Sequence, residues 1–354
     1  MRFDEPAWWY GPPDAPAARC LAPAAWLWQR ATEYRWLRVK PHRSARPVVC
    51  VGNFTVGGTG KTPLAGAIAQ KLAALGRTPV ILSRGYGGRL AGPHWVDAAR
   101  DGARDVGDEP LLHAVAYPVL ISRDRSAGAM TICARGVAGD VIVMDDGLQN
   151  PSLVKDLAIA VVDGRRGLGN GRVLPAGPLR ASLAFQMPLV DAIVVVLPGG
   201  GAGYDESRLR EQLKVASRPV LMAHIAPVGP PVGPGPFVAW AGIGAPQRFF
   251  NLLRAQGATI SREITFPDHH MPTQDEAREL LQTAERLGAG LVTTRKDFVR
   301  VRGGPGALDA LATASRTLDI ALSLSAGDDA RLTALLRALA DPDTLPSVRT
   351  RLRG

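Results

Sequence analysis

A glycine-rich stretch that follows an apolar run carries the clearest chemical signal in the chain. Residues 48–51 are rich in β-branched side chains, and residues 57–62 read Gly-Gly-Thr-Gly-Lys-Thr. In such a loop, backbone N–H groups turn inward around a di- or triphosphate, Lys61 can place its charge between the β- and γ-phosphates, and the Thr62 hydroxyl can ligate Mg²⁺. The sequence therefore predicts a nucleotide-binding loop made of Thr55, Val56, Gly57, Gly58, Thr59, Gly60, Lys61 and Thr62.

One position departs from the strict phosphate-loop pattern. That pattern has a glycine five residues before Gly60, where this chain has Thr55. The helical pattern at residues 64–75 supports the prediction, because the positive dipole end of a helix favours the same anion. The alternative is a glycine-rich turn that carries an ordinary surface lysine.

Two adjacent acids follow another apolar run. Residues 141–144 read Val-Ile-Val-Met, and Asp145 and Asp146 come directly after them. Ligands of open α/β sheets bind at the carboxyl ends of the strands, and a carboxylate there holds Mg²⁺ in phosphate-loop enzymes. The predicted metal ligands are therefore Thr62, Asp145 and Asp146, and the alternative for the two acids is the capping of a turn.

Asp108 is a candidate to accept or orient the proton of an acceptor alcohol. It follows Gly107 and precedes Glu109 and Pro110, a pattern typical of a helix start. A phosphoryl acceptor needs such a group, but capping of the helix N-terminus is the competing role for this aspartate.

Two neighbouring histidines, His269 and His270, follow an apolar run and Asp268. An acid–base or phosphate-contacting histidine is one interpretation, and a solvated turn is the other. No companion residues have zinc spacing, so we do not expect a zinc site.

Several arginines follow predicted strands or occupy the long loop at residues 164–180. They can clamp phosphates, or else they lie on the surface: Arg84, Arg123, Arg125, Arg165, Arg166, Arg172 and Arg180.

Strand and helix patterns alternate along most of the chain. This alternation predicts an α/β fold: a phosphate-loop NTPase-like, mostly parallel sheet with helices on both faces, plus a smaller C-terminal α/β domain. A stretch made almost entirely of proline and glycine at residues 227–236 predicts a linker. The predicted domains are an N-terminal segment (1–46), a kinase core (47–226), the linker (227–236), a C-terminal domain (237–345) and a basic tail (346–354).

Composition limits the class of protein. The 354 residues include three scattered cysteines and carry a formal net charge of +10. The cysteines predict neither a disulfide framework nor a zinc cluster and fit a reducing cytoplasm, and the charge predicts an anionic partner. No apolar stretch approaches about 18 residues and no signal peptide is evident, so we expect no membrane span.

An aromatic and basic segment precedes the glycine-rich loop. Residues 23–39 have helical periodicity with three flanking tryptophans, and arginines and lysines dominate residues 30–46. Tryptophans at headgroup depth with arginines on anionic lipid are typical of an interfacial helix. A helix that docks on its own domain is the alternative.

Taken together, the chain resembles the tetraacyldisaccharide 4′-kinases, the lipid A 4′-kinases of the inner membrane of Gram-negative bacteria. The resemblance covers both predicted domains in order and includes the missing first glycine of the phosphate loop. The matching segments are residues 51–63, 83–87, 107–110, 145–149, 167–172, 174–180 and 266–270.

The resemblance implies a kinase of lipid A biosynthesis that uses ATP and Mg²⁺. Its acceptor would be the 4′-hydroxyl of an anionic, acylated glucosamine disaccharide lipid, phosphorylated at position 1. It implies that Asp108 is the base for this hydroxyl, that His269 supports it, that Asp145 and Asp146 serve Mg²⁺ and catalysis, and that Arg123 stabilises charge. The catalytic residues it implies are thus Asp108, His269, Asp145, Asp146, Lys61 and Arg123.

The resemblance also implies peripheral contact with the cytoplasmic face of the inner membrane. We expect no nucleic-acid partner, because no recognition element accompanies the charge, and no obligate protein partner. The runner-up function is a membrane-associated switch ATPase that regulates a protein partner, which would have no use for Asp108.

Two positions depart from the family pattern. Ala181 follows Arg180 where the family usually has a glutamate, so metal ligation must rest on the two aspartates, Thr62 and water. Arg295 stands where glutamate is commoner.

Overall fold

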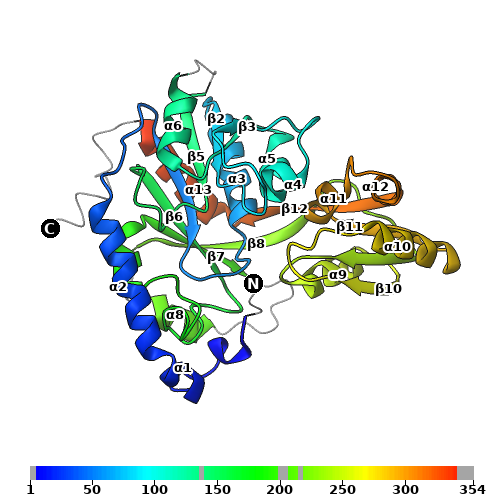
Figure 1. Ribbon diagram of the computed structural model, residues 1–354, viewed down its shortest axis with the longest axis horizontal. Coiled ribbons are helices and arrows are strands. Elements are labelled where there is room, and N and C mark those ends of the chain that lie inside the picture. Colours follow the sequence, from blue (N-terminus) through cyan, green and yellow to red (C-terminus); the bar gives the residue numbers. More distant parts are fainter. Residues whose placement is uncertain (1–4, 135–138, 198–205, 214–217, 341–354) are drawn as a thin grey trace. The chain divides into compact units, whose positions relative to one another are not determined.

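The computed structural model describes residues 5–134, 139–197, 206–213 and 218–340, and the chain forms two compact units (Figure 1). Unit 1 consists of Met1–Leu82, Asp124–His224 and Leu322–Gly354, and unit 2 consists of Ser83–Arg123 and Ile225–Ala321. The chain therefore passes from one unit to the other four times. This division differs from the predicted domains, because residues 83–123 group with the C-terminal half; the predicted basic tail lies outside the described residues.

Unit 1 is an α/β layer structure. Its strands are β1 (Val48–Asn53), β2 (Pro79–Ser83), β5 (Val141–Asp145), β6 (Leu157–Asp163), β7 (Ala192–Leu197) and β8 (Val220–Val228). Its helices are α1 (Pro16–Cys20), α2 (Ala22–Arg38), α3 (Lys61–Ala74), α6 (Arg125–Ala134), α7 (Leu183–Gln186), α8 (Glu206–Leu213) and α13 (Ala326–Arg337), with short 3₁₀ turns at Ala7–Tyr10, Met187–Leu189 and Ala338–Ala340.

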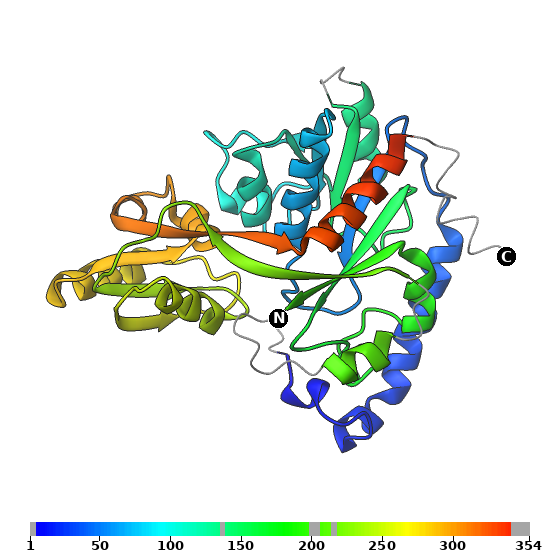
Figure 2. The same cartoon turned by 180° about the vertical axis from the view of Figure 1, so that it is seen from behind.

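The strands of unit 1 run parallel in the order β8-β7-β6-β1-β5-β2. Every residue of β1, β2, β5 and β6 is buried, as expected of a parallel sheet that is covered on both faces. In this register Val51 lies beside Asp145, so the ends of β1 and β5 meet at one edge of the sheet. Helix α2 lies along the outer edge of this unit in both ribbon views (Figures 1 and 2).

Unit 2 carries a smaller parallel sheet. Its strands are β9 (Phe237–Ala241), β10 (Ile260–Thr265), β11 (Gly290–Thr294) and β12 (Ser315–Leu324), in the order β10-β9-β11-β12, with an antiparallel pair β3 (His94–Trp95) and β4 (Val119–Ile121). Its helices are α4 (Ala103–Val106), α5 (Asp108–Ala114), α9 (Pro246–Ala255), α10 (Gln274–Arg286), α11 (Arg295–Val301) and α12 (Ala307–Ala314).

Strand β9 divides the core of unit 2 into two layers, because its alternate side chains point to opposite faces. Phe237 and Ala239 pack with Phe250 of α9 on one face, and Val238 and Trp240 pack with α10 and α12 on the other. The sheet is therefore covered by helices on both faces, in accord with the predicted second α/β layer.

A third apolar cluster explains why residues 83–123 belong to unit 2. Val106 of α4, Leu111 of α5 and Ile121 of β4 pack together with Val299 of α11. Periodicity reports which side of a helix is apolar and says nothing of which distant segment covers it, so the sequence placed this segment with its chain neighbours.

Most long elements match their predictions, whereas several short helices were missed. The predicted helix at residues 23–39 is α2, and the loop at residues 164–180 forms no helix or strand. The sequence did not predict α7, α11 or α12, which have too few turns to show periodicity. Strand β8 continues to Val228, so residues 227 and 228 are strand instead of linker.

Candidate active site

The glycine-rich loop joins the buried strand β1 to helix α3, as predicted. Gly57 and Gly60 have φ values of 94° and 96°, which β-branched or bulky residues rarely adopt. Helix α3 begins at Lys61, earlier than the predicted residue 64, so Lys61 and Thr62 lie in its first turn. This strand–loop–helix geometry presents the positive end of α3 and the Lys61 ammonium at one point, as anion binding requires.

Two buried oxygens point to a ligand at this loop. The Asn53 side-chain oxygen and the Thr59 hydroxyl have no hydrogen-bond partner within the part of the chain that the structure describes. Buried polar groups normally have partners, since a buried polar group without one costs about 1–3 kcal/mol. A polyphosphate with its bound ion and water is a chemically suitable partner for such groups.

The end of β5 brings Asp145 and Asp146 to the same edge. Asp145 is 2% exposed, and Asp146 has a φ of 51°, a left-handed conformation that is uncommon for aspartate. The Lys61 Nζ lies 3.9 Å from an Asp146 carboxylate oxygen. The structure therefore brings Lys61 and Asp146 together, as the sequence predicts for a phosphate loop and its metal-binding acids.

Arg180 ties these parts together. It donates to both Asp146 carboxylate oxygens (3.0 and 3.3 Å) and to the Thr55 carbonyl (3.1 Å). Burial opposes ionisation of Asp146, but the charges of Lys61 and Arg180 outweigh it, and the pKa of Asp146 is lowered from its ordinary value. Asp146 is thus an anion held between two cations.

The predicted metal ligands suit Mg²⁺ by their chemistry. Thr62, Asp145 and Asp146 offer a hydroxyl and two carboxylates, and oxygen ligands completed by water are what Mg²⁺ prefers. Among the described residues, no group of three or more His, Cys, Asp or Glu side chains is arranged to hold a metal ion. The two adjacent acids and Thr62 therefore remain the candidate ligands.

Asp108 and His269 meet in unit 2. The His269 Nδ1 lies 3.1 Å from Asp108 Oδ2, whereas His270 contacts the Glu276 carboxylate at 2.8 Å and stacks on Phe266. His269 has a φ of 58°. Of the two neighbouring histidines, His269 is therefore the one that faces Asp108.

The start of α5 explains how Asp108 is presented. Gly107 is the N-cap, with a φ of 89°, and a β-carbon there would collide with the Tyr86 carbonyl. Asp108 is the first helical residue, one position later than the cap that the sequence suggested, and its Oδ1 accepts from the Glu109 N–H at 2.8 Å. The carboxylate is 5% exposed, so it is held and largely shielded.

A buried arginine that the sequence did not single out binds the same carboxylate. Arg300 of α11 has a fully buried side chain, and its Nε donates to Asp108 Oδ2 at 2.8 Å while its Nη2 also donates to that oxygen. Its Nη1 donates to Asp297 Oδ1 and to the Gly242 carbonyl, both at 2.6 Å. Arg300 thus bridges two buried carboxylates in unit 2.

Lys296 and Glu109 complete the cluster around Asp108. The Lys296 Nζ lies 3.2 Å from Glu109 Oε1, 3.4 Å from His269 Nε2 and 3.9 Å from Asp108 Oδ2. Burial lowers the pKa of Lys296, but the charges of Glu109 and Asp108 outweigh it, and the net effect raises that pKa. Lys296 therefore contributes a positive charge beside the Asp108–His269 pair.

These contacts fix the charge state of Asp108. Burial raises its pKa, but the His269 hydrogen bond and the charges of Lys296 and Arg300 outweigh burial, so the pKa of Asp108 lies below its ordinary value. An anionic carboxylate with Oδ2 bound by nitrogen donors can orient an acceptor hydroxyl. It is a weak base, however, so the proton would transfer only as the hydroxyl oxygen bonds to phosphorus.

Arg123 lies in unit 2 and donates to the Gly88 carbonyl at 3.2 Å. The predicted site residues therefore fall into two sets. The phosphate loop, Asp145 and Asp146 belong to unit 1, and Asp108, His269 and Arg123 belong to unit 2.

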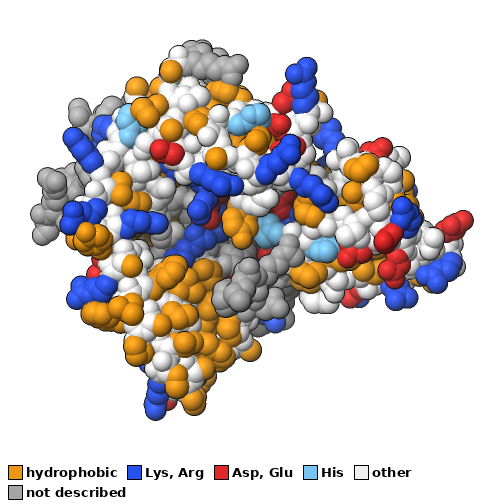
Figure 3. Space-filling view, in the orientation of Figure 1, with side chains coloured by type: hydrophobic (Ala, Val, Ile, Leu, Met, Phe, Trp, Pro, Cys, Tyr) orange, Lys and Arg blue, Asp and Glu red, His pale blue; other side chains and the backbone are white. Residues whose placement is uncertain are grey.

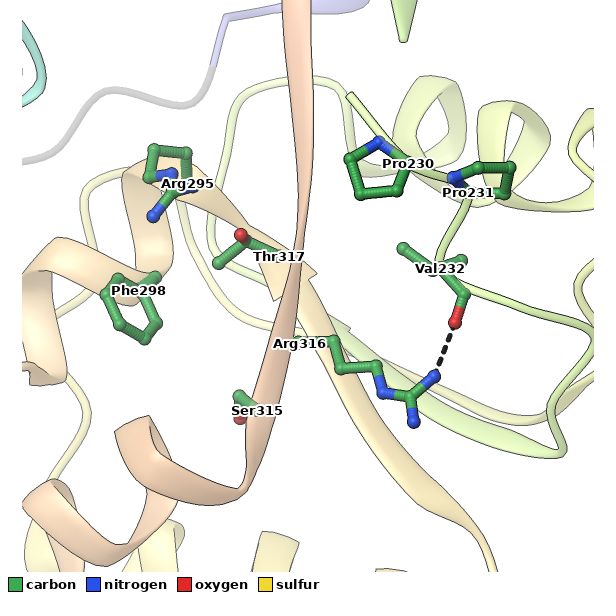
Figure 4. Close-up of a pocket in the computed structure, with 8 residues that line it drawn as sticks. All are labelled: Pro230, Pro231, Val232, Arg295, Phe298, Ser315, Arg316 and Thr317. Carbon is green, nitrogen blue, oxygen red and sulfur yellow. Dashed lines mark hydrogen bonds between the residues drawn. The ribbon is translucent and has the colours of Figure 1, made fainter. Parts of the chain in front are cut away.

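A separate hollow of about 450 Å³ in unit 2 contains none of the predicted site residues. Its lining includes Arg316, which donates to the Val232 carbonyl at 2.6 Å, as Figure 4 shows. Its other arginine, Arg295, is paired with Asp319 at 2.5 Å. Since both arginines have partners within the unit, the hollow presents no clear ligand chemistry.

Comparisons with known proteins show the family to which the sequence is similar. A family described as LpxK, tetraacyldisaccharide-1-P 4′-kinase, matches residues 17–340. The tetraacyldisaccharide 4′-kinase of Methylorubrum extorquens (strain PA1) is 52% identical over 300 residues, which cover 84% of this chain and 89% of that protein. That of Rhodopseudomonas palustris (strain BisB5) is 45% identical over 336 residues, covering 93% and 94%.

A solved structure supports the fold. The crystal structure of an "apo" form of LpxK from Aquifex aeolicus in complex with ATP aligns with a TM-score of 0.70 at 24% identity, covering 91% of this chain and 99% of that one. This likeness confirms the predicted α/β fold class.

Proposed function

Because the chain belongs to the tetraacyldisaccharide-1-P 4′-kinase family, we propose that it transfers the γ-phosphate of ATP to the 4′-hydroxyl of a tetraacylated, 1-phosphorylated glucosamine disaccharide. The observation that carries the proposal is the contact of His269 with the buried Asp108 carboxylate, at 3.1 Å, in a chain that also has a phosphate loop. A switch ATPase regulating a protein partner has no use for such a pair, and it is not favoured.

Unit 1 supplies the nucleotide half of the reaction. The loop amides, Lys61 and the start of α3 bind the phosphates of ATP, and Arg180 holds Asp146 and the loop together through its contacts with Asp146 and Thr55. Thr62, Asp145 and Asp146 would hold Mg²⁺, which would neutralise phosphate charge. These groups act by position and charge.

Unit 2 supplies the acceptor half. Asp108 orients the 4′-hydroxyl and receives its proton as the new O–P bond forms and the bond between the γ-phosphorus and ADP breaks. His269 and Arg300 hold the carboxylate through Oδ2. Arg123 is our candidate for stabilising the charge of the transferring phosphoryl group.

Helix α2 is proposed to hold the enzyme at the cytoplasmic face of the inner membrane. Trp26, Leu27, Trp28, Tyr34 and Leu37 are 48–83% exposed, and Figure 3 shows hydrophobic side chains gathered over α1 and α2. The guanidinium of Arg30 lies over the Trp26 ring and that of Arg38 over Tyr34. Aromatic rings paired with arginines suit an anionic lipid surface. In the described residues, no helix is long and apolar enough to cross a membrane.

Removing apolar side chains from α2 is expected to weaken membrane binding. The double variant Trp26→Ser/Leu37→Ser should bind anionic phospholipid vesicles about 10–100-fold more weakly, because each side chain loses its transfer free energy. Vesicle sedimentation measures this. Leu287→Ser, which removes a leucine 46% exposed after α10, is the control that should bind like the wild type; equal binding by all three proteins would contradict the role of α2.

The kinase reaction itself can be tested with γ-labelled ATP, Mg²⁺ and the tetraacyldisaccharide 1-phosphate in detergent micelles. We expect the wild type to transfer label to the lipid. The rate of transfer should fall by about 10²–10³-fold in Lys61→Met, because this variant lacks the ammonium that stabilises the charge of the transferring phosphoryl group. Lys71→Met, which changes a lysine in the same helix α3 that pairs with Asp329, should remain active. ATP hydrolysis without labelled lipid would reject the kinase and favour the switch ATPase.

A further inference from the structure

A carboxylate from the N-terminal segment lies against the phosphate loop. A β-carbon built on Gly57 would collide with Glu5 Oε1, and it would lie 3.4 Å from Arg166 Nη1. Gly57 is the third residue of the predicted nucleotide-binding loop. Glu5 and Arg166 therefore occupy the space directly above a residue of the loop that binds phosphate in the proposed function.

Two side chains bind this carboxylate. Arg166 Nη1 donates to Glu5 Oε2 at 2.8 Å, and the Tyr10 hydroxyl donates to the same oxygen at 2.6 Å. The Arg166 guanidinium also stacks on the Tyr10 ring, 5.3 Å from its centroid. The three side chains form a compact group that presents one anion to the loop.

The backbone around Glu5 is anchored to the long loop at residues 164–180. Trp9 is 7% exposed, its carbonyl accepts from the Asn170 N–H at 2.7 Å, and its indole N–H donates to the Pro175 carbonyl at 3.2 Å. The contacts of Trp9 therefore hold the segment that carries Glu5 against the long loop.

A triphosphate and a carboxylate at this place compete for the same cations. The loop attracts anions through its amides and Lys61, and two anions that approach the same glycine repel each other. A guanidinium that binds a carboxylate through charge-assisted hydrogen bonds is equally suited to a phosphate oxygen. We infer that Arg166 is a phosphate-binding residue of the nucleotide site, and that Glu5 is an internal anion which ATP must displace from Arg166.

This inference rests on the proposed function, because it takes the loop to bind ATP. It predicts that nucleotide affinity is set partly by the fraction of molecules in which Glu5 has released Arg166. Removing the Glu5 carboxylate removes the state in which Glu5 occupies Arg166 and competes with ATP. The apparent affinity for ATP should then rise by the reciprocal of the released fraction.

Calorimetric titration of the full-length protein with Mg²⁺-ATP tests the inference. Glu5→Gln and Glu5→Ala should bind ATP about tenfold more tightly than the wild type, and Arg166→Met about tenfold more weakly. In the double variant Glu5→Gln/Arg166→Met the gain in ATP affinity should vanish. Once Arg166 is absent, removing the Glu5 carboxylate releases no guanidinium for the phosphate. Weaker or unchanged binding by both Glu5 variants would overturn the inference, whatever Arg166→Met does.

Matched controls separate this effect from a general change of charge. Asp14→Asn removes another carboxylate of the N-terminal segment, one that pairs with Arg19, and Arg43→Met removes an arginine that is 60% exposed; both should bind ATP like the wild type. If the wild type binds ATP but transfers no label to lipid, the kinase proposal fails while the Glu5 comparison still stands. If the wild type binds no ATP, both fail.

Discussion

Replacing Asp108 by asparagine is expected to lower phosphoryl transfer by about 10²–10⁴-fold. Asparagine keeps the shape of the side chain but cannot take the hydroxyl proton, and its amide cannot pair with Arg300 as the carboxylate does. Affinity for ATP should not change, since we assign the nucleotide to residues of unit 1. Initial rates with labelled ATP, together with calorimetric ATP binding, measure the two effects separately.

The control for Asp108→Asn is Asp105→Asn, which changes an aspartate of the neighbouring helix α4 that pairs with Arg89. This variant should transfer phosphate at nearly the wild-type rate. Transfer by Asp108→Asn at the wild-type rate would reduce Asp108 to a structural residue at the start of α5. The lowered pKa of Asp108 adds a further expectation: at a pH of about 4, where an ordinary aspartate is half protonated, Asp108 should remain ionised.

Replacing Arg300 by methionine is expected to lower the free energy of unfolding by about 3–5 kcal/mol. The guanidinium is fully buried and binds Asp108 and Asp297, so its loss leaves two buried carboxylates without the cation they share. Urea unfolding followed by circular dichroism measures this change. The double variant Arg300→Met/Asp297→Asn should be less destabilised than the sum of the two single variants, because it removes one of the stranded charges.

Arg302→Met, which changes an exposed arginine two residues further along, should shift the free energy of unfolding by no more than about 0.5 kcal/mol. Acid should narrow the difference in stability between the wild type and Arg300→Met. A carboxylate with a lowered pKa stabilises the fold above its ordinary pKa, and that stability is lost as the pH falls through the folded-state value. In Arg300→Met the pKa of Asp108 rises, so less stability remains to be lost in acid. Equal stability of wild type and Arg300→Met at neutral pH would contradict the assignment of Arg300.

The sequence predicts that the glycine-rich loop and the acids at the end of β5 come together, because this arrangement depends on local patterns. Residues 57–62 form a loop whose conformation follows from its glycines, and Asp145 follows a buried strand. In a parallel sheet the carboxyl ends of strands meet at one edge, so the two segments come together without any knowledge of the loops between them.

The acceptor half depends on contacts that no local pattern encodes. Arg300 lies 192 residues from Asp108, and its helix α11 follows β11 directly at Arg295 without a turn residue to mark the change. A helix of seven residues is too short to show periodicity. The sequence offered one signal, Thr294 three residues before Asp297, which is a helix-start pattern that would have placed a short helix there.

The adjacent histidines illustrate the same limit. His269 and His270 differ by one position, and only the left-handed backbone at His269 turns one ring to Asp108 and the other to Glu276. Likewise, the first sixteen residues have no regular pattern, so Glu5, Tyr10 and their partner Arg166 could not be connected before the structure was known.

The composition of unit 2 from two separate stretches of chain constrains how such a protein can be cut or recombined. Asp108 comes from Ser83–Arg123, and His269 and Arg300 come from Ile225–Ala321. A fragment that begins at the proline- and glycine-rich stretch would contain the histidine and the arginine without their carboxylate, and would expose the apolar side of α11 that Val106 and Leu111 cover. A chimaera between two relatives should therefore exchange both stretches together, and a proteolytic nick in the stretch should leave unit 2 in two pieces that remain associated.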